Sequence, residues 1–482
     1  MLDVVIIGAG VSGAFIARKL ARYELKIALF ERETDVGNVT SNANSAIVHS
    51  GYDPVPHTLK ALLNVRGNAM FDTIADELDV HFNRCGSLTV AVSDEQMSML
   101  NDLVKRSEEN GVPVKLLTAE EVIKMEPHIN KEVKGALLAP TAGVIDPFNL
   151  VVHCVENAVD NGVELHLSEP VIDIKDNGDY FVIKTNKGEY QSKVVINAAG
   201  LYSDKIASMI EDIDWKLIPR KGEYFVLDHY DVGLVNHTIF PLPSAKGKGV
   251  LVSMTSSNNY IVGPSSEPID DVEDFATDSY TLGEIRRQAT ELVPDIPFNQ
   301  VIRVFSGIRP TPTTHDFIIQ PAKSNKRFIN VAGIESPGLV SSPAIAEYVF
   351  ENYVSKLFDL VEKKNFNPRV KKYHRLNDMT LEERNAMIKE NPEYGKIICN
   401  CETVSLGEIK ELFTRSVPPT TVKGVKRRCR AGFGKCQGGF CSPLVTLILA
   451  KHYGVSPLDI KWDKEASNIL KEEVKKIWLN VI

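Results

Sequence analysis

Hydrophobic positions change their spacing within the first thirty residues of the chain. Residues 3–7 are mainly apolar, apolar residues then recur at helical spacing through Leu20, and a second apolar run covers Lys26–Phe30. Short apolar runs are typical of buried strands, and a period near 3.6 is typical of an amphipathic helix. We therefore expect a β–α–β unit at the start of the chain.

The chain as far as about residue 356 continues to mix both patterns. The patterns predict strands at Ser87–Val92, Tyr180–Lys184, Lys193–Asn197 and Phe328–Gly333, and helices at Asp94–Asn110, Leu150–Asn161 and from about Ser336 to Lys356. Residues 356–394 are richer in Lys, Asn, Arg and Glu, which indicates a connector with one amphipathic helix near Leu381–Lys389.

Composition narrows the class of protein. A length of 482 residues predicts two or more domains, and 43% hydrophobic with 24% charged residues is typical of a soluble globular protein. The net charge of −8 argues against general nucleic-acid binding. No apolar run approaches the roughly 20 residues that span a bilayer, and the first residues resemble a strand rather than a signal peptide. We expect a cytoplasmic protein, at most peripheral to a membrane.

A glycine motif, Gly8-Ala9-Gly10-Val11-Ser12-Gly13, lies between the first predicted strand and helix. Gly8 permits the tight turn, Gly10 lets a pyrophosphate approach the backbone, and Gly13 lets helix and strand pack closely. Glu31 ends the second predicted strand, where its carboxylate can accept hydrogen bonds from a ribose. This context favours dinucleotide binding over a simple glycine-rich turn, but it leaves FAD and NAD open.

Several further motifs follow one another over residues 1–350. They are Glu31-Arg32, Asp35-Val-Gly, Ser41-Asn-Ala-Asn-Ser, Val48-His-Ser-Gly51, Ala142-Gly-Val-Ile-Asp-Pro-Phe148, Ile196-Asn-Ala-Ala-Gly200, Ile218-Pro-Arg-Lys-Gly-Glu-Tyr224, Lys246-Gly-Lys-Gly-Val250, Ser306-Gly-Ile-Arg-Pro310 and Ser336-Pro-Gly-Leu-Val-Ser-Ser342. Together these motifs resemble the D-amino-acid-oxidase-like flavoproteins. Within that family they resemble the glycerol-3-phosphate dehydrogenase and oxidase branch, with L-2-hydroxyglutarate dehydrogenase as a close cousin.

The resemblance implies an α/β chain with a GR2-type, doubly wound FAD-binding fold. Residues 1–355 would form the oxidoreductase, in which an FAD domain (1–85, 140–220 and 300–355) is interleaved with an α+β substrate domain. The FAD contacts that the resemblance implies are Gly8, Gly10, Val11, Ser12, Gly13, Glu31, Arg32, Thr40, Ser41, Asn44, Ser45, Val171, Ala199, Gly200, Gly307, Gly338, Leu339 and Val340.

The oxidation of an alcohol by a flavin needs a base for the hydroxyl proton and anchors for the rest of the substrate. His49 is the candidate base, because histidine titrates near neutral pH and the resemblance places it beside the flavin. A loop histidine that only orders the flavin is the alternative. Arg309 can bind an oxyanion through two hydrogen bonds. The resemblance adds Lys248 or Lys246, and Ser341 or Ser342, to the anion site.

The same branch implies the substrate. Glycerol 3-phosphate is the first candidate, oxidised to dihydroxyacetone phosphate with hydride transfer to N5 of the flavin. An L-2-hydroxy acid such as 2-hydroxyglutarate is the closest rival, and an amine or imino acid is the third candidate.

Cysteines are concentrated near the end of the chain, where five of the seven lie between residues 399 and 441. In a reducing cytoplasm this clustering favours a metal site over disulfides. The pattern is Cys399-x-Cys401, then 34 residues, then Cys436-x4-Cys441. One intervening residue is unusual for zinc, whose paired ligands are more often two to four residues apart, although zinc stays open on spacing alone.

This pattern, with the run from Val425 to Cys441, resembles the bacterioferritin-associated-ferredoxin-like [2Fe–2S] domain that is often fused to such flavoproteins. The resemblance implies a small helical domain at 395–482, joined by a linker at 356–394, with Cys399, Cys401, Cys436 and Cys441 as cluster ligands. Cys429 stands where fused relatives commonly have threonine and is interpreted as a spare residue. Cys441 would lie at the start of a helix over Leu444–His452, capped by Ser442, which favours its thiolate. The basic residues at 426–428 and 430 could form a solvated face, offset the negative charge of the cluster or dock a partner, and we favour the offset of charge.

Fusion of a two-electron flavin to a one-electron cluster indicates a dehydrogenase with an internal electron exit. A glycerol-3-phosphate oxidase that forms H2O2 beside a structural cluster is one alternative, and a non-catalytic iron-binding scaffold is another. The resemblance also implies a hetero-oligomer with an NAD(P)-linked flavoprotein subunit and a small cysteine-rich protein, with quinone as the alternative acceptor.

Overall fold

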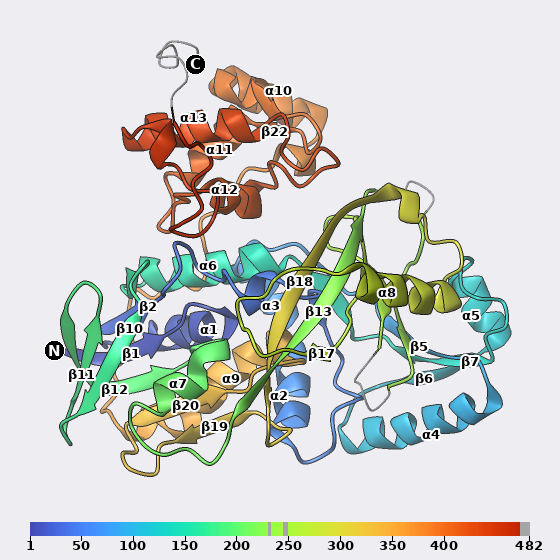
Figure 1. Cartoon of the computed structure of the whole chain (residues 1–482), viewed down its shortest axis with the longest axis horizontal. Coiled ribbons are helices and arrows are strands. Elements are labelled where there is room, and N and C mark those ends of the chain that lie inside the picture. Colours follow the sequence, from blue (N-terminus) through green and yellow to red (C-terminus); the bar gives the residue numbers. More distant parts are fainter. Residues whose placement is uncertain (230–232, 244–248, 473–482) are drawn as a thin grey trace. The chain divides into compact units, whose positions relative to one another are not determined.

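The computed structural model describes residues 1–229, 233–243 and 249–472 (Figure 1). It divides into two compact units. The first comprises Met1–Phe30, Gly37–His166 and Val171–Val370, and the second comprises Glu31–Val36, Leu167–Pro170 and the chain from Lys371 onwards. The boundary at Val370 lies inside the segment that the composition indicated as a connector.

The first unit contains an eight-stranded sheet that begins with the predicted β–α–β unit. Its central strands are parallel: β1 pairs with β12 on one side and with β2 on the other, in the register Val5↔Val195 and Val5↔Ala28. The buried parts of these strands, at residues 4–7, 27–30 and 194–196, are apolar because helices cover both faces of such a sheet. The strands of this sheet are β1 (Leu2–Ile7), β2 (Ile27–Phe30), β9 (Glu164–His166), β10 (Val171–Asp176), β11 (Phe181–Thr185), β12 (Glu189–Asn197), β19 (Ile318–Pro321) and β20 (Phe328–Ala332).

Helix α1 (Val11–Leu20) packs against both α6 (Pro147–Asp160) and α9 (Gly338–Asn352) (Figure 1). Helix α6 starts three residues before its predicted position, because the Asp146 carboxylate accepts hydrogen bonds from the N–H groups of Phe148 and Asn149 and caps the helix. Helix α9 ends at Asn352 rather than near Lys356, and a short 3-10 turn follows it. Cys154 is fully buried in α6, whereas Cys85 is half-buried.

A second, nine-stranded sheet supports the other half of the first unit. Strands β13 and β18 are its longest and pair along most of their length (Figure 1). Helix α8 (Ser279–Leu292) packs on this sheet through buried Ile285 and Ala289. The strands are β5 (Ser87–Ala91), β6 (Lys115–Thr118), β7 (Gly135–Ala139), β13 (Leu217–Leu227), β14 (Thr238–Pro241), β15 (Leu251–Met254), β16 (Tyr260–Gly263), β17 (Glu267–Pro268) and β18 (Val301–Pro312).

A small antiparallel sheet of β3 (Ile47–Val48), β8 (Gly143–Ile145) and β4 (Phe82–Asn83) places the segment that carries His49 directly after β3. The remaining helices of the first unit are α2 (Leu59–Asn68), α3 (Phe71–Glu77), α4 (Asp94–Glu109), α5 (Ala119–Met125) and α7 (Ser203–Ala207). In the part of the chain that the structure describes, no helix is both long enough and apolar enough to cross a bilayer.

The second unit is mainly helical. A capping box joins Ser405 and Glu408 at the start of α11. Helix α13 starts at Ser442 with Cys441 as its N-cap residue, so the prediction of Ser442 as the cap was wrong by one position. Helix α10 buries none of its residues. The elements are α10 (Leu381–Glu390), β21 (Ile397–Cys399), β22 (Val404–Ser405), α11 (Leu406–Leu412), α12 (Val422–Cys429) and α13 (Ser442–Tyr453).

Candidate active site and cluster site

The glycine-rich turn before α1 has no room for side chains. Gly8 has a φ of +101°, and a Cβ atom there would lie 2.5 Å from the carbonyl oxygen of Ala198. A Cβ atom on Gly13 would lie 1.9 Å from the carbonyl oxygen of Gly8. Strand, turn and helix therefore pack as closely as a dinucleotide site requires, and the N-terminus of α1 is open to a ligand.

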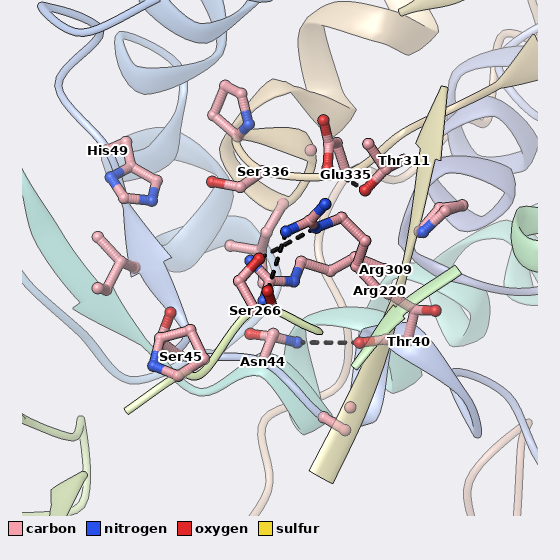
Figure 2. A pocket seen from close by; sticks show the side chains of 18 of the residues that line it. Thr40, Asn44, Ser45, His49, Arg220, Ser266, Arg309, Thr311, Glu335 and Ser336 are labelled. Atoms are coloured by element: carbon pink, nitrogen blue, oxygen red, sulfur yellow. Dashed lines mark hydrogen bonds between the residues drawn. The ribbon is translucent and has the colours of Figure 1, made fainter. Parts of the chain in front are cut away.

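A cavity of about 1180 Å³ extends from this turn across the first unit (Figure 2). Small-molecule sites typically enclose roughly 300–1,000 Å³, so this cavity has room for a large cofactor together with a small substrate. The predicted site residues that line it are Gly10, Val11, Ser12, Thr40, Ser41, Asn44, Ser45, His49, Gly200, Gly307, Arg309, Gly338 and Leu339.

Hydrogen bonds fix the loop of residues 40–45 along the cavity wall. The Val11 N–H donates to Ser41 Oγ at 2.9 Å, and Thr40 Oγ1 donates to the Ile308 carbonyl at 2.8 Å. A Cβ atom on Gly307 would lie 2.1 Å from the carbonyl oxygen of Ala43. The loop and strand β18 therefore touch through backbone atoms, and this brings Gly307 and Arg309 to the cavity.

The backbone of His49 is held by two side chains of α2. Its carbonyl oxygen accepts hydrogen bonds from Asn64 Nδ2 at 2.7 Å and from Asn68 Nδ2 at 3.0 Å. The imidazole is half-buried, and its centroid lies 5.8 Å from that of the Phe240 ring, another residue of the cavity wall. This arrangement leaves the ring at the cavity surface (Figure 2).

Arg309 extends into the cavity from β18 and donates from Nη2 to the Ser265 carbonyl at 2.6 Å. Three further polar residues of the wall, Arg220, Lys60 and Glu335, were missed by the sequence argument. Lys60 Nζ lies 2.8 Å from Glu335 Oε1. Only the register of β13 and β18 brings Arg220 opposite Arg309, and no sequence signal gives that register.

Several of the predicted site residues do not line this cavity. Ser341 and Ser342 are fully buried in α9, where Ser342 Oγ donates to the Gly338 carbonyl at 2.6 Å. Their contact with a substrate stays a prediction, as do the FAD contacts of Val171, Ala199 and Val340. The described residues that line the cavity include neither these three nor the two serines.

Glu31 and Arg32 belong to the second unit. The Glu31 carboxylate accepts a hydrogen bond from the Glu33 N–H at 2.9 Å, and the Arg32 side chain pairs with Glu33. Whether Glu31 binds a ribose stays a prediction. Lys246 and Lys248 lie outside the described residues.

In the second unit the four predicted ligands meet in two pairs. Cys399, at the end of β21, accepts a hydrogen bond from Cys441, which lowers the pKa of Cys399 to about 6. Cys401 and Cys436 are also hydrogen-bonded to each other. The prediction of a favoured Cys441 thiolate was wrong, because the hydrogen bond to Cys399 and burial raise the pKa of Cys441.

Glycines in the loop between α12 and α13 let its backbone lie close to these thiols. A Cβ atom on Gly434 would lie 2.3 Å from Cys401 Cβ, and one on Gly432 would lie 3.8 Å from Cys441 Sγ. Among the described residues, no three His, Cys, Asp or Glu side chains converge as a single metal ion would need. Four free cysteines in two pairs fit a [2Fe–2S] cluster, which takes four thiolates.

Cys429 and the basic residues 426–428 are buried, and Arg430 is half-buried and pairs with Glu402 at 2.7 Å. Cys429 Sγ donates to the Val425 carbonyl at 3.3 Å, and burial raises the pKa of its thiol to about 12, which favours the spare role. Arg428 forms a two-pronged ion pair with Asp35 at 2.7 and 2.8 Å, and Arg427 adds a third contact at 3.0 Å. The interpretation of this run as a solvated face was therefore wrong.

Comparison with known proteins finds a matching family model for each of two parts of the chain. Residues 3–352 match the family model described as FAD dependent oxidoreductase. The chain belongs to the FAD-dependent oxidoreductase family. Residues 397–451 of this oxidoreductase match the BFD-like [2Fe–2S] binding domain. The predicted cofactors, FAD and a [2Fe–2S] cluster, are thereby confirmed.

Two relatives of this FAD-dependent oxidoreductase are named for the same substrate, glycerol 3-phosphate. A glycerol 3-phosphate dehydrogenase of Caloramator mitchellensis is 46% identical and covers 98% of this chain and 99% of its own length. A glycerol 3-phosphate oxidase of Mycoplasma genitalium is 34% identical over 76% of this chain and 97% of its own length.

The FAD-bound structure of L-alpha-glycerophosphate oxidase from Mycoplasma pneumoniae is similar to this oxidoreductase, with a TM-score of 0.73 at 30% identity. The match covers 77% of this chain and 98% of that one. The predicted α/β fold class is confirmed by this similarity together with the two domain matches.

Proposed function

We propose that this protein is a cytoplasmic, FAD-dependent dehydrogenase that oxidises sn-glycerol 3-phosphate to dihydroxyacetone phosphate. Its electrons leave through the [2Fe–2S] cluster to a partner protein or to quinone. In this proposal the oxidoreductase domain is 1–355, the connector 356–394 and the cluster domain 395–482. The observation that carries the proposal is the 46% identity to a glycerol 3-phosphate dehydrogenase along nearly the whole of both chains.

The lengths of the relatives favour a dehydrogenase over an oxidase. The oxidase relative from M. genitalium uses 97% of its own length to match only 76% of this chain, so it has no counterpart for about a quarter of the chain. The dehydrogenase relative matches 98% of the chain and therefore spans the cluster domain as well. A [2Fe–2S] cluster carries electrons one at a time, which an enzyme that reduces oxygen at its flavin does not require.

The side chains of the cavity can supply the rest of the chemistry. When bound, FAD accepts the two electrons that leave the substrate carbon. His49 at the cavity wall removes the hydroxyl proton as a general base, and Arg309 holds the phosphate. The lysines at 246 and 248, and Ser341 or Ser342, remain proposed contributors to the same anion site.

The partner proposal rests on the resemblance of the fused domains. We expect an NAD(P)-linked flavoprotein subunit and a small cysteine-rich protein to accept the electrons. Co-purification of the natively expressed protein tests this point, because a flavoprotein in stoichiometric amount supports the proposal and a solitary chain contradicts it.

Flavin bleaching under anaerobic conditions tests the substrate. Glycerol 3-phosphate is expected to bleach the flavin of the holoprotein at lower concentration and faster than 2-hydroxyglutarate, lactate, proline or sarcosine. Oxygen uptake with the same substrate is expected to be slow compared with reduction of an artificial acceptor. Faster bleaching by 2-hydroxyglutarate would favour the hydroxy-acid alternative, and rapid peroxide formation would favour the oxidase.

A further inference from the structure

Two arginines stand directly opposite each other on the longest strand pair of the first unit. Arg220 of β13 pairs with Arg309 of β18 in the antiparallel register. Side chains of directly opposed residues lie on the same face of a sheet, and like charges in that position destabilise the pair. Both residues line the cavity, and Figure 2 shows the two side chains extending to the same part of it, beside Ser266.

The loop after β16 holds both guanidinium groups. Arg220 donates from Nε to Ser266 Oγ at 3.1 Å and from Nη2 to the Ser266 carbonyl at 2.9 Å, while Arg309 donates to the adjacent Ser265 carbonyl. Consecutive residues of one loop thus anchor the two cations. Gly222 provides the space, because a Cβ atom there would lie 2.9 Å from Arg309 Nη2.

No carboxylate pairs directly with either arginine within residues 1–229, 233–243 and 249–472, where both guanidinium groups donate to Ser265 and Ser266. Glu335 is one of five carboxylate residues of the cavity wall, with Asp53, Glu267, Asp278 and Glu284. It is engaged by Lys60 Nζ at 2.8 Å and by Thr311 Oγ1 at 2.7 Å. With a guanidinium offering five N–H donors, most of the donors of Arg309 and several of those of Arg220 remain available to a ligand.

We propose that Arg220 is a second anion-binding residue of this site, and that it selects a dianionic phosphate substrate over a carboxylate. This inference rests on the proposed function and deepens it. A phosphate monoester carries about −1.5 to −2 charges near neutral pH, whereas a carboxylate carries one. Two guanidinium groups on one face match the charge and the oxygen geometry of a phosphate, and one suffices for a carboxylate.

Substitution of Arg220 separates binding from turnover. In Arg220→Met, the half-saturating concentration of glycerol 3-phosphate in anaerobic flavin bleaching is expected to rise about 10- to 100-fold, because a charge-assisted contact is lost. The limiting rate at saturation should change less than threefold or so. Arg220→Lys should recover part of the affinity, because an ammonium supplies the charge without the two-pronged geometry.

Direct binding of inorganic phosphate to the FAD-loaded enzyme gives a second readout that needs no turnover. The dissociation constant, followed by the flavin absorbance, should rise about tenfold or more in Arg220→Met. Arg327→Met is the matched control, because Arg327 is an exposed arginine of the same unit that contacts Asp179. It should leave both the phosphate affinity and the half-saturating concentration unchanged.

The outcomes separate the two claims. If glycerol 3-phosphate bleaches the wild-type flavin but Arg220→Met shifts neither constant by more than twofold, the role of Arg220 is wrong while the proposed function stands. If Arg220→Met purifies without FAD, Arg220 serves the cofactor and the inference is also wrong. If no glycerol 3-phosphate oxidation occurs but phosphate binding depends on Arg220, the proposed function fails and the phosphate site remains.

Discussion

His49 shows how a single side chain is given its role by its surroundings. Asn64 and Asn68 hold its carbonyl oxygen, and Phe240 lies beside its ring, so the imidazole stays at the cavity wall. A base in this position must lie within hydrogen-bond reach of the substrate hydroxyl. A histidine that only orders the flavin would satisfy the same contacts, and substitution distinguishes the two roles.

We expect His49→Asn to lower the limiting rate of anaerobic flavin bleaching by about 10²- to 10⁴-fold, because the general base is lost. The half-saturating concentration and the FAD content should change little. His128→Asn is the control, since His128 contacts Asp295 on the surface of the same unit. A variant that loses FAD in proportion to its activity would show that His49 only orders the cofactor.

Asp35 is a buried carboxylate of the second unit that pairs with two buried arginines. Burial alone would raise the pKa of its carboxyl, but the charges of Arg428 and Arg427 outweigh burial and hold the pKa at about 2. A carboxyl with a depressed pKa contributes stability that is complete above its unfolded value of about 3.9. That contribution is lost as the pH falls from about 5 through 2.

Asp35→Asn should destabilise the second unit by about 3–5 kcal/mol, because it removes the negative charge that faces the buried Arg428 and leaves Arg427 with its longer, 3.8 Å contact to Asp463. Unfolding of the holoprotein by denaturant, followed by the visible absorbance of the cluster, measures the effect. The variant should also lose the acid dependence between pH 5 and 2. Asp76→Asn, which removes an exposed ion pair with Arg369, is the control, and equal stability of the two variants would contradict this account.

At the scale of elements, the glycines of the first β–α–β unit let β1, the turn after it and α1 contact one another closely. Gly13→Ala is expected to lose most of the bound FAD, since its Cβ atom would lie 1.9 Å from the Gly8 carbonyl oxygen and would displace α1 from the turn. Flavin absorbance per protein measures the loss. Gly283→Ala in α8 is the control, because nothing lies within 4 Å of its added Cβ atom. Full FAD occupancy in Gly13→Ala would contradict the packing argument.

The sequence predicted those features that depend on local spacing. The apolar runs located β1, α1 and β2, and the helical spacing located α4. Partners far apart in the chain were not predictable in the same way. The opposition of Arg220 and Arg309 needs the register of β13 and β18, and Asp35 and Arg428 are 393 residues apart. A charge run such as 426–430 gives no sign of burial until its partner is known.

At the scale of the whole molecule, the account assigns substrate oxidation to one unit and electron exit to the other. The cavity with His49, Arg220 and Arg309 lies in the first unit, and the four cysteines lie in the second. This division predicts that the cluster can be removed without loss of substrate oxidation. Cys401→Ser should abolish the EPR signal of the reduced cluster and electron delivery to an acceptor, because four thiolates are needed to hold it.

The most direct measurement follows flavin absorbance and cluster EPR in the same anaerobic sample after addition of glycerol 3-phosphate. For the wild-type protein we expect the flavin to bleach and the EPR signal of the reduced [2Fe–2S] cluster to appear. For Cys401→Ser we expect bleaching at an unchanged rate with no EPR signal. A wild-type cluster that stays oxidised, or a Cys401→Ser variant that is folded and contains FAD but does not bleach, would contradict the central claim.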